Sequence, residues 1–188
     1  MKLSGTYQIN LEKQKVWEAL NDPEILKKSI PGCEEFKKNS ETEFTATATN
    51  KIGPFNASFT GDIELKDLYP PNSYKITGSG NSPVGFANGE ARVTLEDLDD
   101  GTKLNYVVEA NVGGKIAQVG SRLIDMAAKK MADIFFKRFS ELISTKTETD
   151  EIKKSAEDKI PREKKSLKKL LIIVCAEIII GIIAYSLS

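Results

Sequence analysis

The side chains that could do chemistry in this chain of 188 residues are carboxylates, tyrosines, lysines and arginines, because the sequence contains no histidine. Histidine is the usual general base, the commonest metal ligand and the partner of serine or cysteine in nucleophile pairs. Asp62, Glu64 and Glu90 could form an acidic site, but they alternate with apolar residues and are predicted on the solvent face of strands. We therefore expect no catalytic residues and no metal site, so the chain is not predicted to be an enzyme.

Glycines and cysteines in the sequence have structural interpretations. Four glycines between residues 78 and 89 are no nucleotide fingerprint, because no helix follows them to receive a phosphate. We interpret them as strand kinks and a loop beside a cavity mouth.

The two cysteines lie in different parts of the chain. Cys33 belongs to the part expected to be soluble, and Cys175 lies in the apolar segment at residues 170–187, so the two are not expected to form a structural disulfide. Residues 1–145 are about neutral and hold no basic block, which argues against a nucleic-acid partner.

The elements that position these residues follow from hydrophobic periodicity. Two short helices are predicted, one over residues 12–20 and one that Asp22 caps and Pro31-Gly32 ends. Period-2 alternation, separated by turn residues, predicts six antiparallel strands. The strands are expected at residues 3–10, 42–50, 55–66, 73–78, 84–96 and 102–112. After Gly113-Gly114 the period becomes helical, which predicts one helix over residues 115–143.

These elements predict an α+β fold in which a curved antiparallel sheet wraps around a long helix. Many inward positions of the strands are alanine or glycine, which permits either close packing against the helix or a cavity. We favour a cavity, because a strongly curved sheet cannot contact a straight helix along its whole length. The residues expected to line it are Phe44, Ala46, Phe55, Ala57, Phe59, Tyr106, Val108, Ile116, Leu123, Met126 and Ala127.

Aromatic residues of the predicted helices are interpreted first as core residues. Trp17 is expected to anchor the first short helix in the core rather than contact a ligand. Phe135, Phe136 and Phe139 are not expected all to face one side of the long helix. We expect one or two of them to be exposed, either in contact with the end strands or as a membrane or partner patch.

The carboxyl-terminal part of the sequence has the composition of a tether and an anchor. Residues 144–169 are highly charged and poor in aliphatic side chains, which predicts a flexible tether, with a partly helical tether as the alternative. Residues 170–187, from Leu170 to Leu187, are long and apolar enough for a transmembrane helix. Glu177 lies near its middle, where a carboxylate must be protonated or paired. The folded domain is then residues 1–143.

The flanking charges predict the orientation of this anchor. A basic collar precedes the span and consists of Arg162, Lys164, Lys165, Lys168 and Lys169. Positive charge stays on the cytoplasmic side of a membrane span. We therefore expect a single-pass protein of the cell membrane whose soluble domain faces the cytoplasm.

Several segments resemble the family of the carbon monoxide dehydrogenase G subunit, within the START-like or helix-grip (SRPBCC) superfamily of lipid and hydrophobic-ligand binders. The resemblance covers almost all of residues 1–143. The segments that carry it are LSGTYQI, KVWEALNDPEILKKSIPGCEEF, KIGPFNASFTGDIEL, GSGNSPVGFANGEARVTLED and GTKLNYVVEANVGGKIAQVGSRLIDMAAKKMADIFFKRF.

The resemblance implies an accessory protein that brings a cytoplasmic molybdenum-flavin hydroxylase of the carbon monoxide dehydrogenase type to the membrane. It also implies a hydrophobic ligand such as a quinone or a lipid in the cavity, with no covalently bound cofactor and no catalytic motif. One alternative is a lipid-binding or transfer protein without an oxidoreductase partner. Another is an enzyme of the cyclase or hydrolase type, since a fold alone does not fix a function.

Overall fold

The computed structural model describes residues 1–158, and the side chains of residues 1–145. The chain divides into a compact unit, Met1–Thr145, and a second unit, Lys146–Ser188, so the architecture below is that of the first unit. The predicted membrane span at residues 170–187 lies outside the described residues. Among the helices that are described, none is both long enough and apolar enough to cross a membrane.

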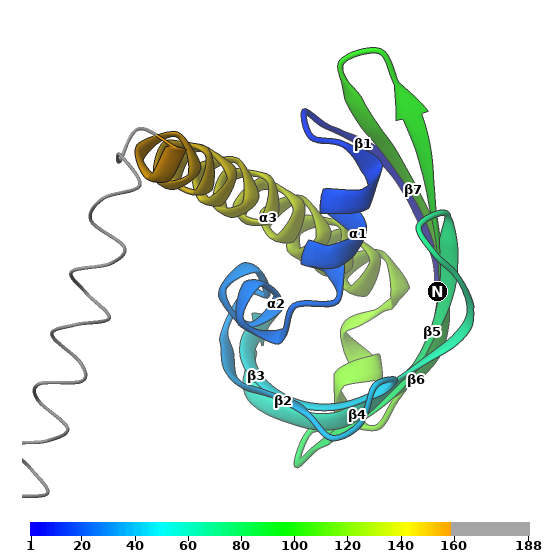
Figure 1. The fold of residues 1–188 in the computed structure, drawn as a ribbon. Helices are drawn as coiled ribbons and strands as arrows, with labels where there is room; N and C mark the ends of the chain where they lie inside the picture. Colours follow the sequence, from blue (N-terminus) through cyan, green and yellow to red (C-terminus); the bar gives the residue numbers. More distant parts are fainter. Residues whose placement is uncertain (159–188) are drawn as a thin grey trace, which may run out of the picture. The chain divides into compact units, whose positions relative to one another are not determined.

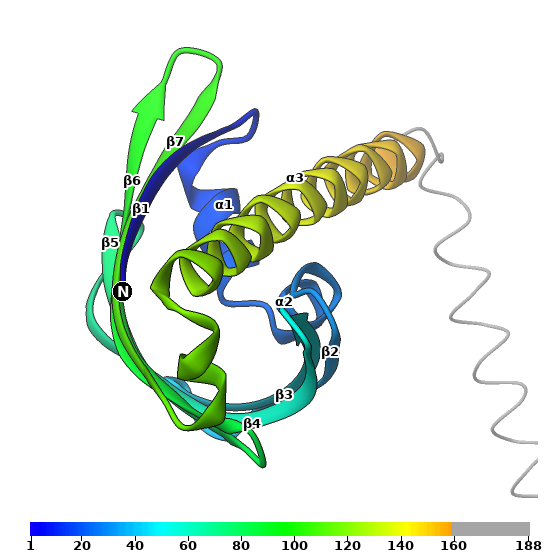
Figure 2. The same cartoon turned by 180° about the vertical axis from the view of Figure 1, so that it is seen from behind.

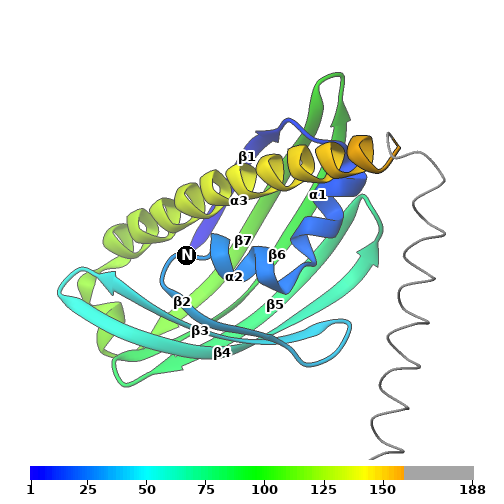
Figure 3. The same cartoon turned by 60° about the vertical axis from the view of Figure 1, so that its left-hand side comes forward.

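Seven antiparallel strands of the described chain form one sheet, in the order β1-β7-β6-β5-β4-β3-β2. The sheet curls so that one face is concave, and α3 lies across that face (Figures 1 and 3). The strands are β1 Lys2–Ile9, β2 Cys33–Lys38, β3 Glu43–Ile52, β4 Phe55–Tyr69, β5 Ser73–Ser82, β6 Gly85–Leu98 and β7 Gly101–Gly113. This arrangement confirms the predicted α+β fold with a curved sheet around a helix.

The prediction of six strands was wrong by one, because β2 was missed. The sequence of β2, CEEFKK, places only Cys33 and Phe36 at half-buried positions, and the remaining four residues are charged and exposed. Such a short charged strand is typical of a sheet edge, where charge discourages pairing with another chain. Its charges hide the period-2 pattern on which the other strands were recognised.

Two short helices, α1 (Lys13–Leu20) and α2 (Pro23–Ser29), follow β1, as predicted. The Asp22 side chain accepts hydrogen bonds from the backbone N–H of Glu24 at 2.9 Å and of Ile25 at 3.3 Å, and Pro23 opens the helix. This cap satisfies donors that the first turn leaves unpaired. The views from both sides place α1 and α2 beside α3, at the open side of the curved sheet (Figures 1 and 2).

The long helix begins later than the sequence suggested. Residues Lys115–Val119 form a 3-10 helix, η1, and α3 spans Ser121–Asp158. Gly120 lies between them with φ +91°, a conformation that ends a right-handed helix and that glycine adopts without strain. Because of this break, η1 and α3 are separate helices that can present different faces to the sheet. The end of α3 also shows that helix continues into the residues predicted as a tether.

The face that α3 turns toward the sheet carries its phenylalanines. Phe139 is fully buried, Phe136 is buried and Phe135 is half-buried against the core, so the expectation that one or two of them are exposed was wrong. With 3.6 residues per turn, positions 135, 136 and 139 fall within an arc of about 100°, which is the width of one apolar helix face. The three rings pack together, with centroids of Phe135 and Phe139 5.8 Å apart.

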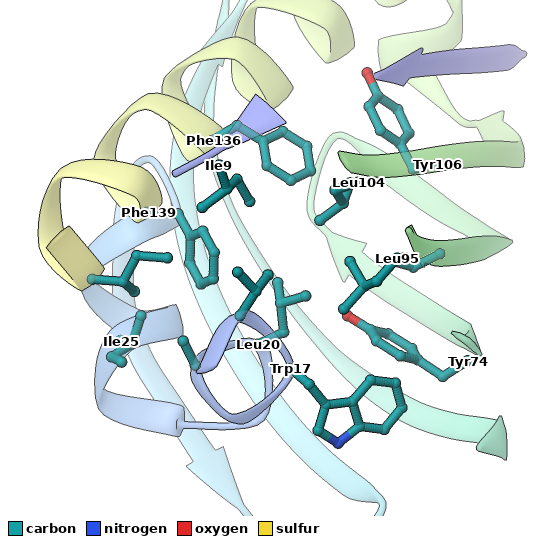
Figure 4. Packing of buried hydrophobic residues seen from close by; sticks show 14 of the residues in the cluster. Ile9, Trp17, Leu20, Ile25, Tyr74, Leu95, Leu104, Tyr106, Phe136 and Phe139 are labelled. Carbon is teal, nitrogen blue, oxygen red and sulfur yellow. The ribbon is translucent and has the colours of Figure 1, made fainter. Parts of the chain in front are cut away.

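The hydrophobic core lies between α1, α2, α3 and the concave sheet face (Figure 4). Trp17 is buried and meets the ring of Tyr74 edge-on at 5.3 Å, which confirms the prediction that it anchors α1 in the core. Val16, Leu20 and Ile25 are buried beside it. The two short helices therefore close the core from the side that the sheet leaves open.

Candidate ligand cavity

An apolar cavity of about 220 Å³ lies within this core. It is bounded by the two short helices, the inward face of β2 to β7, and α3. The lining residues are Leu20, Leu26, Ile30, Phe36, Phe44, Ile63, Leu65, Tyr74, Ile76, Val93, Leu104, Phe135 and Phe136. Figure 4 shows Leu20, Tyr74, Leu104 and Phe136 from four elements of this wall. Among these lining side chains only Tyr74 carries a polar group, so the cavity suits an apolar molecule.

A second, more open hollow of about 340 Å³ adjoins the cavity along the sheet. Ile63 and Ile76 line both spaces. The inward residues that shape the hollow are small: Ala46, Gly61, Gly78, Gly80, Ala87, Gly89, Ala91 and Ala110, with Val108 beside them. The absence of bulk along these strands leaves space where a sheet with larger residues would be filled. Together the two spaces could hold a longer ligand than the core cavity could hold alone.

A third hollow, of about 980 Å³, lies on the outer face of the sheet. Asp62, Glu64 and Glu90 contribute to its lining and are exposed, which confirms that alternation places them on the solvent face. Its lining is largely polar and charged, so it cannot remove a hydrophobic molecule from water as the core cavity can. We therefore take the core cavity, although it is smaller, as the candidate site.

The residues predicted for the cavity occupy three kinds of position. Phe44 is in the cavity wall, and Ala46 and Val108 line the adjoining hollow. Ala57, Tyr106 and Ile116 are buried outside both linings. The others are half-buried or exposed and also lie outside them: Phe55, Phe59, Leu123, Met126 and Ala127.

Most of the cavity wall was missing from the sequence prediction. The missed residues come from the short helices, from β2, from β4 to β7 and from α3, and include Leu20, Leu26, Phe36 and Phe136. The apolar positions of the short helices were recognised, but the sequence held no sign that these helices close the cavity. The register of α3 was assigned from an unbroken helix starting at residue 115, which placed Leu123 and Met126 inward.

A polar contact joins α3 to the edge strand β1 beside the core. The Tyr7 hydroxyl donates a hydrogen bond to the Asp133 carboxylate. The Tyr7 ring stacks on Phe136, with centroids 4.1 Å apart, and also on Tyr106. Gly5 leaves room for this arrangement, since a Cβ there would lie 2.6 Å from the Tyr106 hydroxyl oxygen. The Tyr7–Asp133 hydrogen bond and the stacked rings hold α3 over the sheet. They therefore also position Phe136 in the cavity wall.

The tyrosines of this region give a pH dependence of stability. Burial raises the pKa of Tyr74 and of Tyr106, and burial together with the hydrogen bond to Asp133 raises the pKa of Tyr7. In the unfolded chain tyrosine loses its proton near pH 10. The stability that these protonated hydroxyls contribute is thus complete below about pH 10 and is lost as the pH rises further.

We expect the melting temperature to fall as the pH is raised from 9 to 11, and the Tyr74→Phe variant to show a shallower fall because it has one such hydroxyl fewer. Thermal unfolding followed by circular dichroism at each pH measures this. A variant whose decline matches that of the wild type would show that Tyr74 does not take part.

The fold and the cavity define a class of protein: a helix-grip domain with an apolar cavity between its helices and its sheet. Among the described residues no group of three or more histidine, cysteine, aspartate or glutamate side chains is placed to hold a metal ion. The family model of the carbon monoxide dehydrogenase G subunit (CoxG) matches residues 5–144, and the chain belongs to this family. The family's name describes a subunit of carbon monoxide dehydrogenase.

Solved structures share the fold. A conserved protein from Geobacillus kaustophilus is 32% identical, with a TM-score of 0.74 over 77% of this chain and 96% of the other. A protein from Nitrosomonas europaea is 16% identical, with a TM-score of 0.60 over 78% and 96% of the two chains. A protein from Thermus thermophilus is 12% identical, with a TM-score of 0.59 over 77% and 98%. The last two show the fold alone. No curated protein matches the chain.

Proposed function

We propose that this protein is a membrane-anchored accessory protein that recruits a cytoplasmic molybdenum-flavin hydroxylase of the carbon monoxide dehydrogenase type. In this proposal it also binds a hydrophobic molecule, such as a quinone or a lipid, in its core. The observation that carries the proposal is the apolar cavity of about 220 Å³ with its adjoining hollow. A closely packed domain of this size would contain few voids larger than a water molecule. A wall with a single polar side chain favours a largely hydrocarbon or isoprenoid ligand over a polar one.

Membership in the CoxG family supports the choice of partner, and the apolar segment at residues 170–187 supports the anchor. A basic collar before that segment would hold the folded domain on the cytoplasmic side. Because the sequence contains no histidine, the catalytic and metal-binding constellations that need histidine are not available to the chain. An adaptor that positions another enzyme and carries an apolar molecule accounts for these properties together.

Cell fractionation of a deletion strain tests recruitment. Removing the gene should move the partner hydroxylase from the membrane fraction to the cytosol and slow substrate-dependent respiration, while activity with a soluble dye acceptor stays unchanged. Restoring the chain without residues 166–188 should leave the hydroxylase cytosolic, and restoring the full chain should return it to the membrane. A hydroxylase that stays membrane-bound in the deletion strain would contradict recruitment and favour the second candidate, a lipid-binding or transfer protein that acts without this partner.

A further inference from the structure

Three segments that are distant in sequence meet at one end of the sheet. The backbone N–H of Ile116 in η1 donates a hydrogen bond to the Val84 carbonyl in the β5–β6 turn, at 2.9 Å. In the β3–β4 turn, a Cβ on Gly53 would lie 2.7 Å from the Leu123 side chain, so this turn packs against the start of α3. Figure 3 shows both turns, η1 and the first turns of α3 at this end of the sheet, and we call it the η1 end.

The η1 end combines exposed apolar side chains with positive charge. On α3, Met126 is 68% exposed and Leu123 is 36% exposed. Arg122, Lys129 and Lys130 are exposed as well, and all five positions fall on one side of the helix within an arc of about 120°. A helix surface with basic residues around large apolar ones is the composition of an interfacial membrane contact.

The charge of the η1 end is almost entirely of one sign. Across residues 50–56, 81–87 and 113–130 the only acidic residue is Asp125, which is half-buried. The basic residues of these ranges are Lys51, Lys115, Arg122, Lys129 and Lys130. This excess arises in a domain that is close to neutral over residues 1–145, so opposite charge must gather elsewhere.

The opposite end of the sheet is acidic. Its three turns, within residues 39–42, 67–72 and 97–101, contain no basic residue. Their acidic residues are Glu41, Asp67, Asp97, Asp99 and Asp100. Lysines from neighbouring elements pair with Glu41, Asp67 and Asp97, which lowers the negative charge of this end without reversing it. An anionic surface would thus attract the η1 end and repel the other.

We propose that the η1 end docks on an anionic lipid bilayer, with Leu123 and Met126 entering the interface and Lys115, Arg122, Lys129 and Lys130 contacting lipid head groups. An anionic bilayer is the occupant that fits both properties, because its surface attracts basic residues and its boundary region accepts apolar side chains. The hollow lined by Ala87 and Gly80 lies on the two strands that form the β5–β6 turn of this end. Docking therefore brings the part of the hollow at Gly80 and Ala87 near the lipid.

Tryptophan reporters on the full-length chain test this docking. Trp17 is the only native tryptophan and is buried, so the wild type supplies the background emission. Met126→Trp reports on the η1 end, and Tyr69→Trp reports on the acidic end at an equally exposed position, 67% against 68%. Each variant is mixed with vesicles of phosphatidylcholine and phosphatidylglycerol that carry brominated acyl chains, which quench indole only at contact depth.

The expected result is a blue shift and strong quenching for Met126→Trp, none for Tyr69→Trp, and a marked loss of the Met126→Trp effect in vesicles of phosphatidylcholine alone. Adding Arg122→Glu and Lys129→Glu to the Met126→Trp chain should also reduce quenching, whereas adding Arg92→Glu on the outer sheet face should not.

Equal quenching of both reporters, or quenching of the Tyr69→Trp chain alone, would overturn the proposal. A chain that floats with vesicles while Met126→Trp stays unquenched would mean that the carboxyl-terminal anchor binds lipid and the η1 end does not. This outcome too overturns the docking proposal, and it leaves the proposed anchor intact.

Discussion

Replacing Phe139 with alanine should lower the free energy of unfolding by about 3–5 kcal/mol, the usual cost of emptying a buried phenylalanine site. Phe139 has no solvent exposure, and its ring points from α3 toward the short helices, near Leu20 (Figure 4). Neighbours from α1, α2 and the strands cannot all collapse into the space that the ring leaves. The loss should lower the melting temperature by on the order of 10 °C or more, which thermal unfolding measures directly.

Met126→Ala is the matched control for this change, because it truncates a large apolar side chain on the same helix at an exposed position. A surface substitution of this kind should change stability by no more than about 0.5 kcal/mol. The pair also distinguishes the two registers of α3, since the sequence pattern placed Met126 inward and the structure places Phe139 inward. A larger effect at Met126 than at Phe139 would support the register predicted from the sequence.

The parts of the fold that could be predicted are those whose cause is local. The Asp22 cap with Pro23 predicted the start of α2. Period-2 alternation over β4 to β7 predicted long strands with one solvent-exposed face. Strand β2 could not be found this way, because an edge strand with one half-buried phenylalanine, Phe36, has no apolar stripe. Strand β2 forms because it pairs with β3, and this tertiary contact is not visible in the sequence of β2 itself.

The candidate site depended more on tertiary structure. Small inward residues such as Ala46 correctly indicated open space along the sheet, since a residue's size is visible in the sequence. The closure of that space was not visible, because it depends on where α1, α2 and α3 dock. The break at Gly120 separates α3 from η1, so the helix presents Phe136 and Phe139 to the core instead of Leu123 and Met126. One backbone conformation at a glycine thus decided which helix residues meet the cavity.

Ile76→Trp should abolish the retention of a hydrophobic ligand while leaving the domain folded. Ile76 lies on β5 and lines both the core cavity and the adjoining hollow, so its side chain lies where the two spaces meet. The extra bulk of an indole over isoleucine is smaller than the cavity of about 220 Å³. It can therefore enter existing space instead of displacing core side chains. The same substitution in a close-packed core would cost about 1–3 kcal/mol.

The measurement is solvent extraction of the membrane-purified full-length chain, with mass spectrometry of any small molecule that co-purifies, and thermal unfolding of the same samples. Asn81→Trp is the control, because it places an indole on the same strand at an exposed position and should leave ligand retention unchanged. Loss of ligand in Ile76→Trp alone, with a nearly unchanged melting temperature, is the expected result. If no ligand is recovered from the wild type and Ile76→Trp is strongly destabilised, the interior is packed instead of ligand-binding, because only a filled core would resist the indole.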